Sequence, residues 1–267
     1  MSGNILLAFS LTAIAGLSTG IGSAIAFFSK KTNTKFLSIS LGFSAGVMIY
    51  VSMVEIFVKA QDSLQSALGE KMGAFLTVVA FFAGMLIIGI IDKLIPQKDN
   101  PHEIKIVEPN ISIQPNNDKL MRTGIFTALA IAIHNFPEGL ATFVSALQEP
   151  SLAIPIVAAI AIHNIPEGIA VSVPIYYATG NKKKAFLYSF ASGLSELVGA
   201  VFGYLILLPF INDIVYGLLF ASVAGIMVFI SLDELLPSAR EYGEHHLSIY
   251  GLVGGMIVIA ISLLLFI

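Results

Sequence analysis

The chain contains no cysteine among its 267 residues. A disulfide framework, a thiolate metal site and a thiol redox motif are therefore excluded. Charged residues are also scarce: they make up 12% of the chain, and the formal net charge of −3 is too small to indicate a nucleic-acid partner. Hydrophobic residues make up 56%, and the mean hydropathy is +0.88. This composition predicts a protein that crosses the lipid bilayer several times.

Eight apolar segments are each long enough to cross a bilayer as a helix, for which roughly 20 residues suffice. They predict a single all-α transmembrane domain over residues 1–267 with spans at 5–28, 36–58, 72–91, 124–146, 152–178, 185–208, 214–232 and 247–267. The first segment is too long for the core of a signal peptide, so we expect it to be retained. Residues 96–121, rich in Pro, Asn, Asp and Lys, predict a flexible loop.

The basic residues predict the orientation of these spans, because Lys and Arg gather in cytoplasmic connections. Twelve of the fourteen Lys and Arg residues fall in the connections after spans 1, 3, 5 and 7. The other connections hold only Lys59 and Lys71. Both termini are therefore expected outside, the loop with His102 inside, and the protein in the cytoplasmic (inner) membrane.

A hexapeptide occurs twice, as His-Asn-Phe-Pro-Glu-Gly at residues 134–139 and as His-Asn-Ile-Pro-Glu-Gly at residues 163–168. Each copy lies near the middle of an apolar span, where an ionisable group costs roughly 2.5–3.5 kcal/mol to insert and usually has a function. At about 100° per residue along a helix, Glu138 stands between His134 and Asn135. The second copy repeats this geometry. Each carboxylate is thus placed to share one metal ion with His and a second with Asn.

A second repeat links the two ends of the chain. Residues 45–55 match residues 224–234, and the pattern of glycine and serine in residues 16–22 recurs in residues 193–199. Spans 1 and 2 therefore resemble spans 6 and 7, which cross the membrane in the opposite direction. Secondary transporters bind their substrate at the midplane between such inverted repeats and expose it alternately to each side. Alternating access is the mechanism that this pattern predicts.

Glu196 lies in span 6 at the depth of the two motifs, on a helix with Gly193, Gly199 and Gly203, which allow a neighbour to approach closely. We expect Glu196 to complete the site; a proton relay is the alternative. Carboxylates without cationic partners in a membrane favour a bound cation, and adjacent imidazoles favour a transition metal. Nitrogen and oxygen ligands suit Zn²⁺, Fe²⁺, Co²⁺ or Mn²⁺ and do not distinguish sharply among them.

Other polar residues leave two interpretations open. Glu55 and Glu234 occupy equivalent repeat positions, with Asp233 beside the second, and are either structural or part of vestibules that attract cations. His245 and His246 either receive the ion as it leaves or belong to a solvated loop.

The two motifs, together with Ser-Gly-Leu-Ser-Glu at residues 192–196 and Ser-Leu-Asp-Glu at residues 231–234, resemble the ZIP family of divalent-metal transporters. The resemblance implies uptake of zinc, and also of iron, cobalt, manganese and cadmium, into the cytoplasm with no separate cofactor. It further implies a 3+2+3 bundle, a homodimer, and an elevator-like movement of spans 1, 4, 5 and 6 against spans 2, 3, 7 and 8. Many relatives carry a His-rich loop between spans 3 and 4, where this chain has only His102.

The resemblance also implies two sets of metal ligands. The first ion falls to His134, Glu138, His163 and Glu167, and the second to Asn135, Asn164 and Glu196, with Glu138 and Glu167 bridging the two. An intramembrane metal-dependent enzyme is the alternative. However, the His-Glu-x-x-His order of zinc proteases is absent, and His-x-x-x-Glu differs in order and spacing from the Glu-x-x-His pairs of di-iron oxidases. We therefore predict a transporter and not an enzyme.

The predicted orientation can be tested directly because the chain has no cysteine of its own. Ser29→Cys or Lys183→Cys should react with a membrane-impermeant thiol reagent only from the cytoplasmic side, and Gln65→Cys only from the outside. The opposite labelling pattern would overturn the orientation and the cytoplasmic position of the loop.

Overall fold

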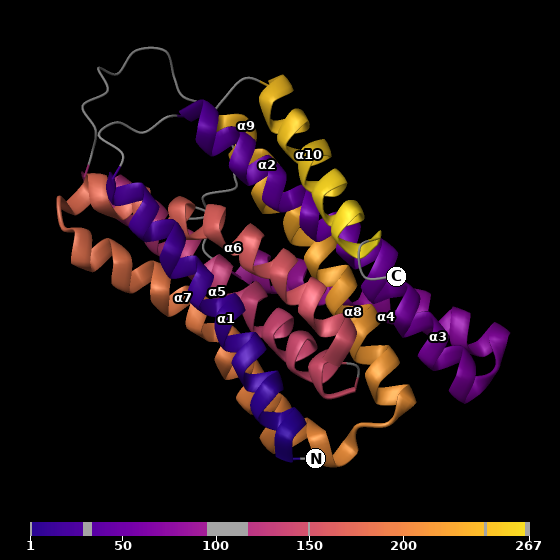
Figure 1. The fold of residues 1–267 in the computed structure, drawn as a ribbon. Helices are drawn as coiled ribbons and strands as arrows, with labels where there is room; N and C mark the ends of the chain where they lie inside the picture. Colours follow the sequence, from indigo (N-terminus) through magenta and orange to yellow (C-terminus); the bar gives the residue numbers. More distant parts are fainter. Residues whose placement is uncertain (1, 29–33, 95–116, 149, 243–244, 265–267) are drawn as a thin grey trace.

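The computed structural model describes residues 2–28, 34–94, 117–148, 150–242 and 245–264, and all secondary structure within these ranges is helical (Figure 1). His102 lies outside them. The helices are α1 (Ser2–Phe28), α2 (Thr34–Val51), α3 (Phe57–Leu68), α4 (Glu70–Leu94), α5 (Asn117–Gln148), α6 (Pro150–Thr179), α7 (Lys182–Phe202), α8 (Asp213–Ile230), α9 (Leu236–Tyr242) and α10 (His245–Leu264).

Within the described ranges, seven helical segments are long and apolar enough to cross a membrane. They are Ile5–Ala24, Ser38–Leu68, Glu70–Lys93, Ile156–Thr179, Lys182–Phe210, Asp213–Arg240 and His246–Leu264. The prediction of a multi-pass helical membrane protein is thereby confirmed. Helix α5 is not among the seven, although it has 32 residues, because the polar residues of its motif and of its first turns lower its mean hydropathy. The eighth span therefore stays a prediction.

Three π-helical turns occur in the described part of the chain, at Ser52–Ile56, Gly203–Leu207 and Ser231–Leu235. The first two lie within the predicted spans 36–58 and 185–208, and the third runs past the predicted end of the span 214–232. The first joins α2 to α3, so this helix continues to Leu68, where Gly69 ends it with a φ of 83°. The span had been predicted to end at residue 58. Polar residues end the part of a helix that lies in lipid, but they do not end the helix itself, because its backbone hydrogen bonds form in water as well.

The start of α5 corrects the predicted loop in the same way. We expected residues 96–121 to form a flexible connection, yet α5 begins at Asn117, so the last five of these residues are helical. The charged residues near position 120 belong to the first turns of this helix. Residues 96–116 lie outside the described residues, and the prediction for them is untested.

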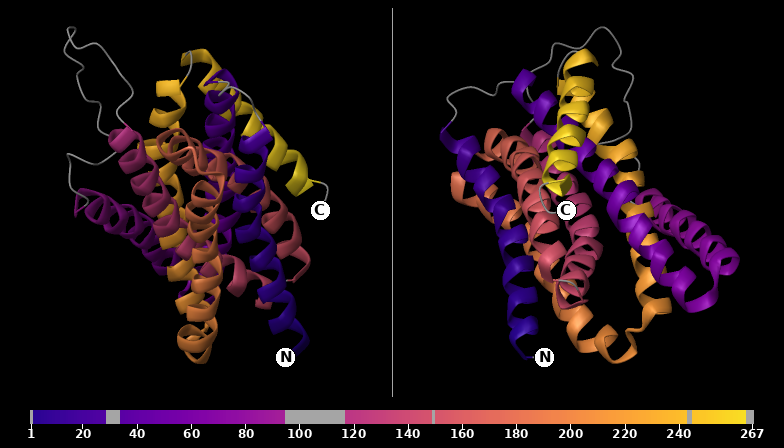
Figure 2. Two further views of the ribbon diagram at one scale, coloured as in Figure 1. Left: turned by 90° about the vertical axis from the view of Figure 1, so that its left-hand side faces the viewer. Right: turned by 45° about the vertical axis from the view of Figure 1, so that its right-hand side comes forward.

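The helices pack into two bundles (Figures 1 and 2). Helices α1, α5, α6 and α7 pack on one another and are called here the motif bundle. The second bundle contains α2, α3, α4, α8, α9 and α10, in which α2 packs on α10 and α4 on α8. The two bundles meet along a seam where α2 lies against α6 and α8 against α5.

Glycines hold the helices of each bundle in close contact. A Cβ added to Gly16 of α1 would collide with the carbonyl of Gly193 on α7, and one added to Gly46 of α2 would collide with the carbonyl of Leu252 on α10. Among the glycines of the described residues, those pressed against the backbone of another helix all do so inside one bundle. Tight backbone packing of this kind is typical of helices associated in lipid. The seam lacks it.

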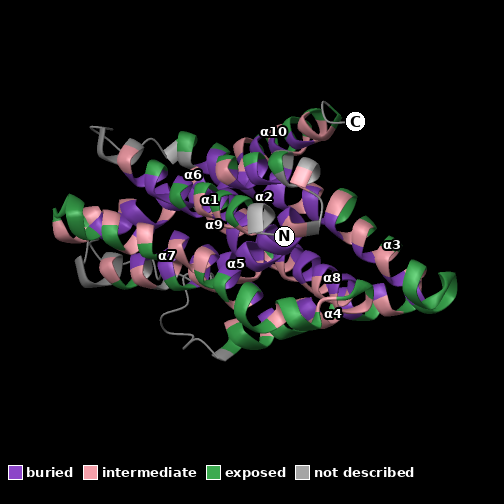
Figure 3. Cartoon of the chain, turned by 60° about the horizontal axis from the view of Figure 1, so that its bottom comes forward, coloured by how far each residue is buried: buried purple, intermediate pink, exposed green. Residues whose placement is uncertain are grey.

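Large apolar side chains are exposed on the second bundle and on α1 and α7, whereas many polar side chains are buried. Figure 3 shows where exposed and buried residues lie along the helices. Leu86 of α4, for example, is 64% exposed, while Thr77 of the same helix is fully buried. This distribution suits a bilayer, where lipid surrounds the apolar surface and polar groups must find partners inside the protein.

The packing of α2 on α10 gives a prediction with an internal control. Gly46→Ala should lower the thermal unfolding temperature of the detergent-solubilised protein by several degrees, because the new Cβ collides with the Leu252 carbonyl and the helices must separate. Gly254→Ala on α10 meets no atom within 4 Å and should leave this temperature unchanged or raise it. Equal effects of the two substitutions would contradict the close contact.

Candidate functional site

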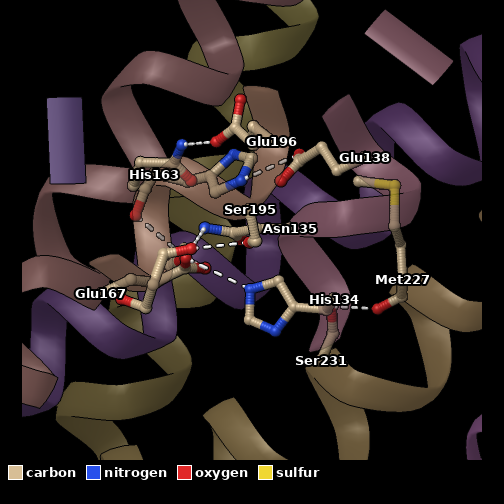
Figure 4. Close-up of polar contacts among 12 residues, drawn as sticks. His134, Asn135, Glu138, His163, Glu167, Ser195, Glu196, Met227 and Ser231 are labelled. Carbon is tan, nitrogen blue, oxygen red and sulfur yellow. Dashed lines mark hydrogen bonds and ion pairs between the residues drawn. The ribbon is translucent and has the colours of Figure 1, made fainter. Parts of the chain in front are cut away.

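The two motifs face one another at the centre of the protein, where α5 packs against α6 (Figure 4). The imidazole and carboxylate groups pair across the two helices. His134 Nε2 lies 3.2 Å from Glu167 Oε2, and His163 Nε2 lies 3.1 Å from Glu138 Oε1. All four side chains are at most 2% exposed. Helical spacing predicted which groups share a face of each helix, and the structure adds that each carboxylate takes its partner from the other motif.

The asparagines of the motifs fasten this pair of helices to their neighbours. The side-chain amide of Asn135 donates to the Ser192 carbonyl of α7 at 3.4 Å, and that of Asn164 donates to the Ala15 carbonyl of α1 at 3.1 Å. Both Oδ1 atoms are buried and accept no hydrogen bond from the described residues. The donors are thus used for support, and the oxygens are left as candidate ligands for a cation.

Glu196 of α7 reaches the same cluster. Its carboxylate is fully buried and accepts a hydrogen bond from the Asn164 amide. Gly139 of the first motif makes room for it, since a Cβ at position 139 would collide with the backbone of Glu196. The structure therefore brings together all seven predicted site residues. They are His134, Asn135, Glu138, His163, Asn164, Glu167 and Glu196.

These groups are paired with one another and do not converge on a single point. Within the described part of the chain, no three His, Asp or Glu side chains stand in a position to hold one metal ion. An incoming ion would have to replace the contacts between the imidazoles and the carboxylates, because each contact occupies electron pairs that would bind the ion.

Ser44 also belongs to the site, although no sequence motif marks it. Its hydroxyl on α2 lies 3.2 Å from Glu167 Oε1 and 3.4 Å from the His163 carbonyl. It is thus a group of the second bundle that touches a carboxylate of the motif bundle. A serine in an apolar span carries no signal of its own, and this contact depends on how α2 packs against α6.

Glu55 and Glu234 occupy equivalent positions of the sequence repeat, but their surroundings in the structure differ. Glu55 forms an ion pair with Lys59 one turn later, at 3.6 Å, and both side chains are partly exposed. Glu234 is buried in the π-helical turn Ser231–Leu235, where its charge interacts with His134. Asp233 is less buried, and its carboxylate is repelled by the like charge of Asp92 on α4.

The C-terminal histidines take no part in the cluster as far as the structure describes them. The ring of His246 stacks on Tyr250 with the centroids 6.2 Å apart. The side chain of His245 lies outside the described residues, as do Gly243 and Glu244.

The sequence profile of a family described as ZIP zinc transporter matches residues 96–263, more than half of the chain and all of the site residues. The chain belongs to the ZIP family. Relatives named zinc transporter ZupT extend the likeness to α1–α4. Those of Streptococcus mutans and Chlorobaculum parvum are 67% and 62% identical to this ZIP chain, each over 100% of both chains. That of Clostridium perfringens is 65% identical over 99% of this chain and 97% of its own.

The two asparagines predict unequal effects on stability in this ZIP protein. Asn164→Ala removes a donor from both the Ala15 carbonyl and Glu196, whereas Asn135→Ala removes one longer contact. The Ala15 and Ser192 carbonyls still accept from the Ser18 and Ser195 hydroxyls. The buried Glu196 oxygen, however, loses the Asn164 amide, and a buried acceptor left without its donor costs about 1–3 kcal/mol. In metal-free protein with a chelator, Asn164→Ala should therefore lower the thermal unfolding temperature more than Asn135→Ala. The reverse order would show that these amides do not fasten the motifs.

Proposed function

We propose that this protein carries zinc, and also iron, cobalt, manganese and cadmium as divalent ions, across the cytoplasmic (inner) membrane into the cytoplasm. The observation that carries the proposal is the buried cluster of two imidazoles, three carboxylates and two amides at the junction of two helical bundles. Membership of the ZIP family and the names of the relatives support zinc as cargo. They also favour transport over the alternative of an intramembrane metalloenzyme.

In this proposal the cluster holds two metal ions. His134, His163, Glu138 and Glu167 bind the first ion. Asn135, Asn164 and Glu196 bind the second, and Glu138 and Glu167 bridge both. The free Oδ1 atoms of the asparagines support the second position, and so does the contact between Asn164 and Glu196. The first position has two imidazoles and two carboxylates, whereas the second depends on Glu196 for a strong charged ligand of its own.

The proposed movement is an elevator-like displacement of the motif bundle against the second bundle. The glycine contacts support it, because they make each bundle tight inside and leave the seam between them without backbone contacts of this type. The contact of Ser44 with Glu167 crosses this seam and would break during the movement. The site would then face one side of the membrane at a time, as alternating access requires.

Several features support an eight-span 3+2+3 inverted repeat in one domain with both termini outside. Helices α1 and α7 run in opposite directions in Figure 1. Two of the π-helical turns, Ser52–Ile56 and Ser231–Leu235, fall in the matched segments 45–55 and 224–234 or directly beside them. The family resemblance adds the homodimer to this proposal.

The number of bound metals tests the two positions separately. Purified parent protein should hold two ions per chain, and Glu196→Gln should hold one tightly, because the second position loses its own charged ligand. His134→Ala combined with His163→Ala should abolish the tight site and stop zinc influx into proteoliposomes. Metal analysis and calorimetric titration measure the number and affinity of the bound ions. A zinc-sensitive dye inside the vesicles measures zinc influx.

Glu55→Gln is the matched control, because Glu55 pairs with Lys59 and lies outside the cluster. It should keep two ions with parental affinity. If Glu196→Gln behaved in the same way as Glu55→Gln, Glu196 would not be a ligand. Unchanged zinc influx in the double histidine variant would refute transport through this site.

A further inference from the structure

The charged residues of α7 gather at one end of the helix. Its first three residues, 182–184, are lysines, and all three are exposed. After them the only charged residue of α7 is Glu196 of the buried cluster. No Asp or Glu occurs between Glu167 of α6 and Glu196. The segment that joins α6 to α7 therefore carries three positive charges and no negative charge of its own.

An apolar stripe begins directly after these lysines. Leu187, Val198, Val201 and Leu205 are between 44% and 65% exposed. Their helical spacing places them on one face of α7 and of the π-helical turn that continues it, and the second and third lysines belong to the same face. From Leu187 to Leu205 the stripe measures about 27 Å, close to the roughly 30 Å of a bilayer's hydrocarbon core. The lysines thus stand where the lipid headgroups begin.

Helix α7 forms the outer edge of the motif bundle, on the side away from α2 and α10 (Figures 1 and 2). Residues 176–188 are called here the lysine end. A small apolar cluster fixes the lysine end on α5; its members are Ala128, Ile131, Val171, Ile175 and Ala185. Tyr176 and Tyr188 pack against this cluster, and Tyr177, whose ring lies 5.9 Å from that of Tyr176, is 50% exposed. Tyrosines are typical of the interface between membrane and water.

The orientation of the protein does not by itself account for this concentration of charge. The rule that places basic residues in the cytoplasm counts them over each connection and does not require them to be adjacent. Among the other described helix ends on that side, α2 begins with the single charged residue Lys35. Asp92 stands beside Lys93 in α4, and Arg240 stands beside Glu241 in α9. None of these ends has three successive basic residues.

We propose that the lysine end and the apolar stripe of α7 bind an anionic phospholipid of the cytoplasmic leaflet. The ammonium groups of residues 183 and 184 contact the phosphate of the headgroup, and an acyl chain lies along the stripe from Leu187 inward. Charge complementarity favours this occupant, because anionic lipids give the cytoplasmic leaflet a negative surface that attracts basic segments beside a membrane span. The lipid would thus be held by the bundle that carries the metal cluster. Only the choice of leaflet rests on the predicted orientation.

Fluorescence quenching tests the lipid site, because the chain has no tryptophan and a single introduced one reports on the lipid beside it. The protein is reconstituted in mixed vesicles of phosphatidylglycerol and phosphatidylcholine, with either lipid brominated in its chains. Leu187→Trp should show a preference for phosphatidylglycerol of at least about 5-fold, since one lysine near an anionic surface contributes about this factor. Tyr177→Trp, a substitution of similar shape, is a second reporter at the lysine end and should give the same result.

Two reporters serve as matched controls. Ile90→Trp is exposed on the same side of the membrane, next to Asp92 and Lys93, whose charges cancel. Leu205→Trp is exposed at the opposite end of the stripe. Neither should distinguish the two lipids. An equal preference at Leu187→Trp and Ile90→Trp would overturn the proposal.

Substitution of the lysines tests their role. Lys183→Gln combined with Lys184→Gln should reduce the preference at Leu187→Trp to that at Ile90→Trp, whereas Arg at both positions should keep it. Lys59→Gln with Lys71→Gln removes the same net charge on the opposite side and should change nothing. An unchanged preference in the first double variant would refute the site. Neither measurement involves a metal ion or transport, so the lipid site can fail while the proposed function stands.

Discussion

The two contacts between imidazole and carboxylate at the centre of the protein are the constraint on which the rest of the structure depends. Isolated charges at this depth are expensive, and a buried pair is stable only when further hydrogen bonds satisfy the groups around it. Helices α1 and α7 provide this support through backbone carbonyls that accept from the motif asparagines. Gly139 and Gly168 bring those helices close enough, because each faces the backbone of α7 or α1 directly.

The same constraint explains why the protein divides into two bundles. The polar cluster belongs to the motif bundle, whose helices are tied together by glycine contacts and asparagine bonds, while Ser44 is the second bundle's contact with Glu167. Because the cluster lies within the closely packed motif bundle and the second bundle contacts it through Ser44, the motif bundle could move without changing the geometry of the cluster. This is the property that alternating access asks of a binding site.

Much of the site was predictable from sequence because its chemistry is local. The spacing of His134, Asn135 and Glu138 fixes their order around a helix, and their position within an apolar run marks them as functional. The crosswise pairing with the second motif was not predictable, because it depends on how α5 and α6 cross. Ser44 was missed for the same reason. The π-helical turn that buries Glu234 near His134 was also missed, since no residue type signals a π turn, and the repeat alone made Glu55 look equivalent.

The central claim is that the paired motifs bind the transported metal. Zinc K-edge X-ray absorption of the zinc-loaded protein tests it most directly. The account predicts a first shell of nitrogen and oxygen only, outer-shell scattering from two imidazoles, and a metal-to-metal distance of about 3.5–4 Å. The imidazole signal should disappear from the tight site when His134 and His163 are both replaced by Ala. A shell of oxygen alone in the parent protein, or an unchanged spectrum in the double variant, would contradict the account.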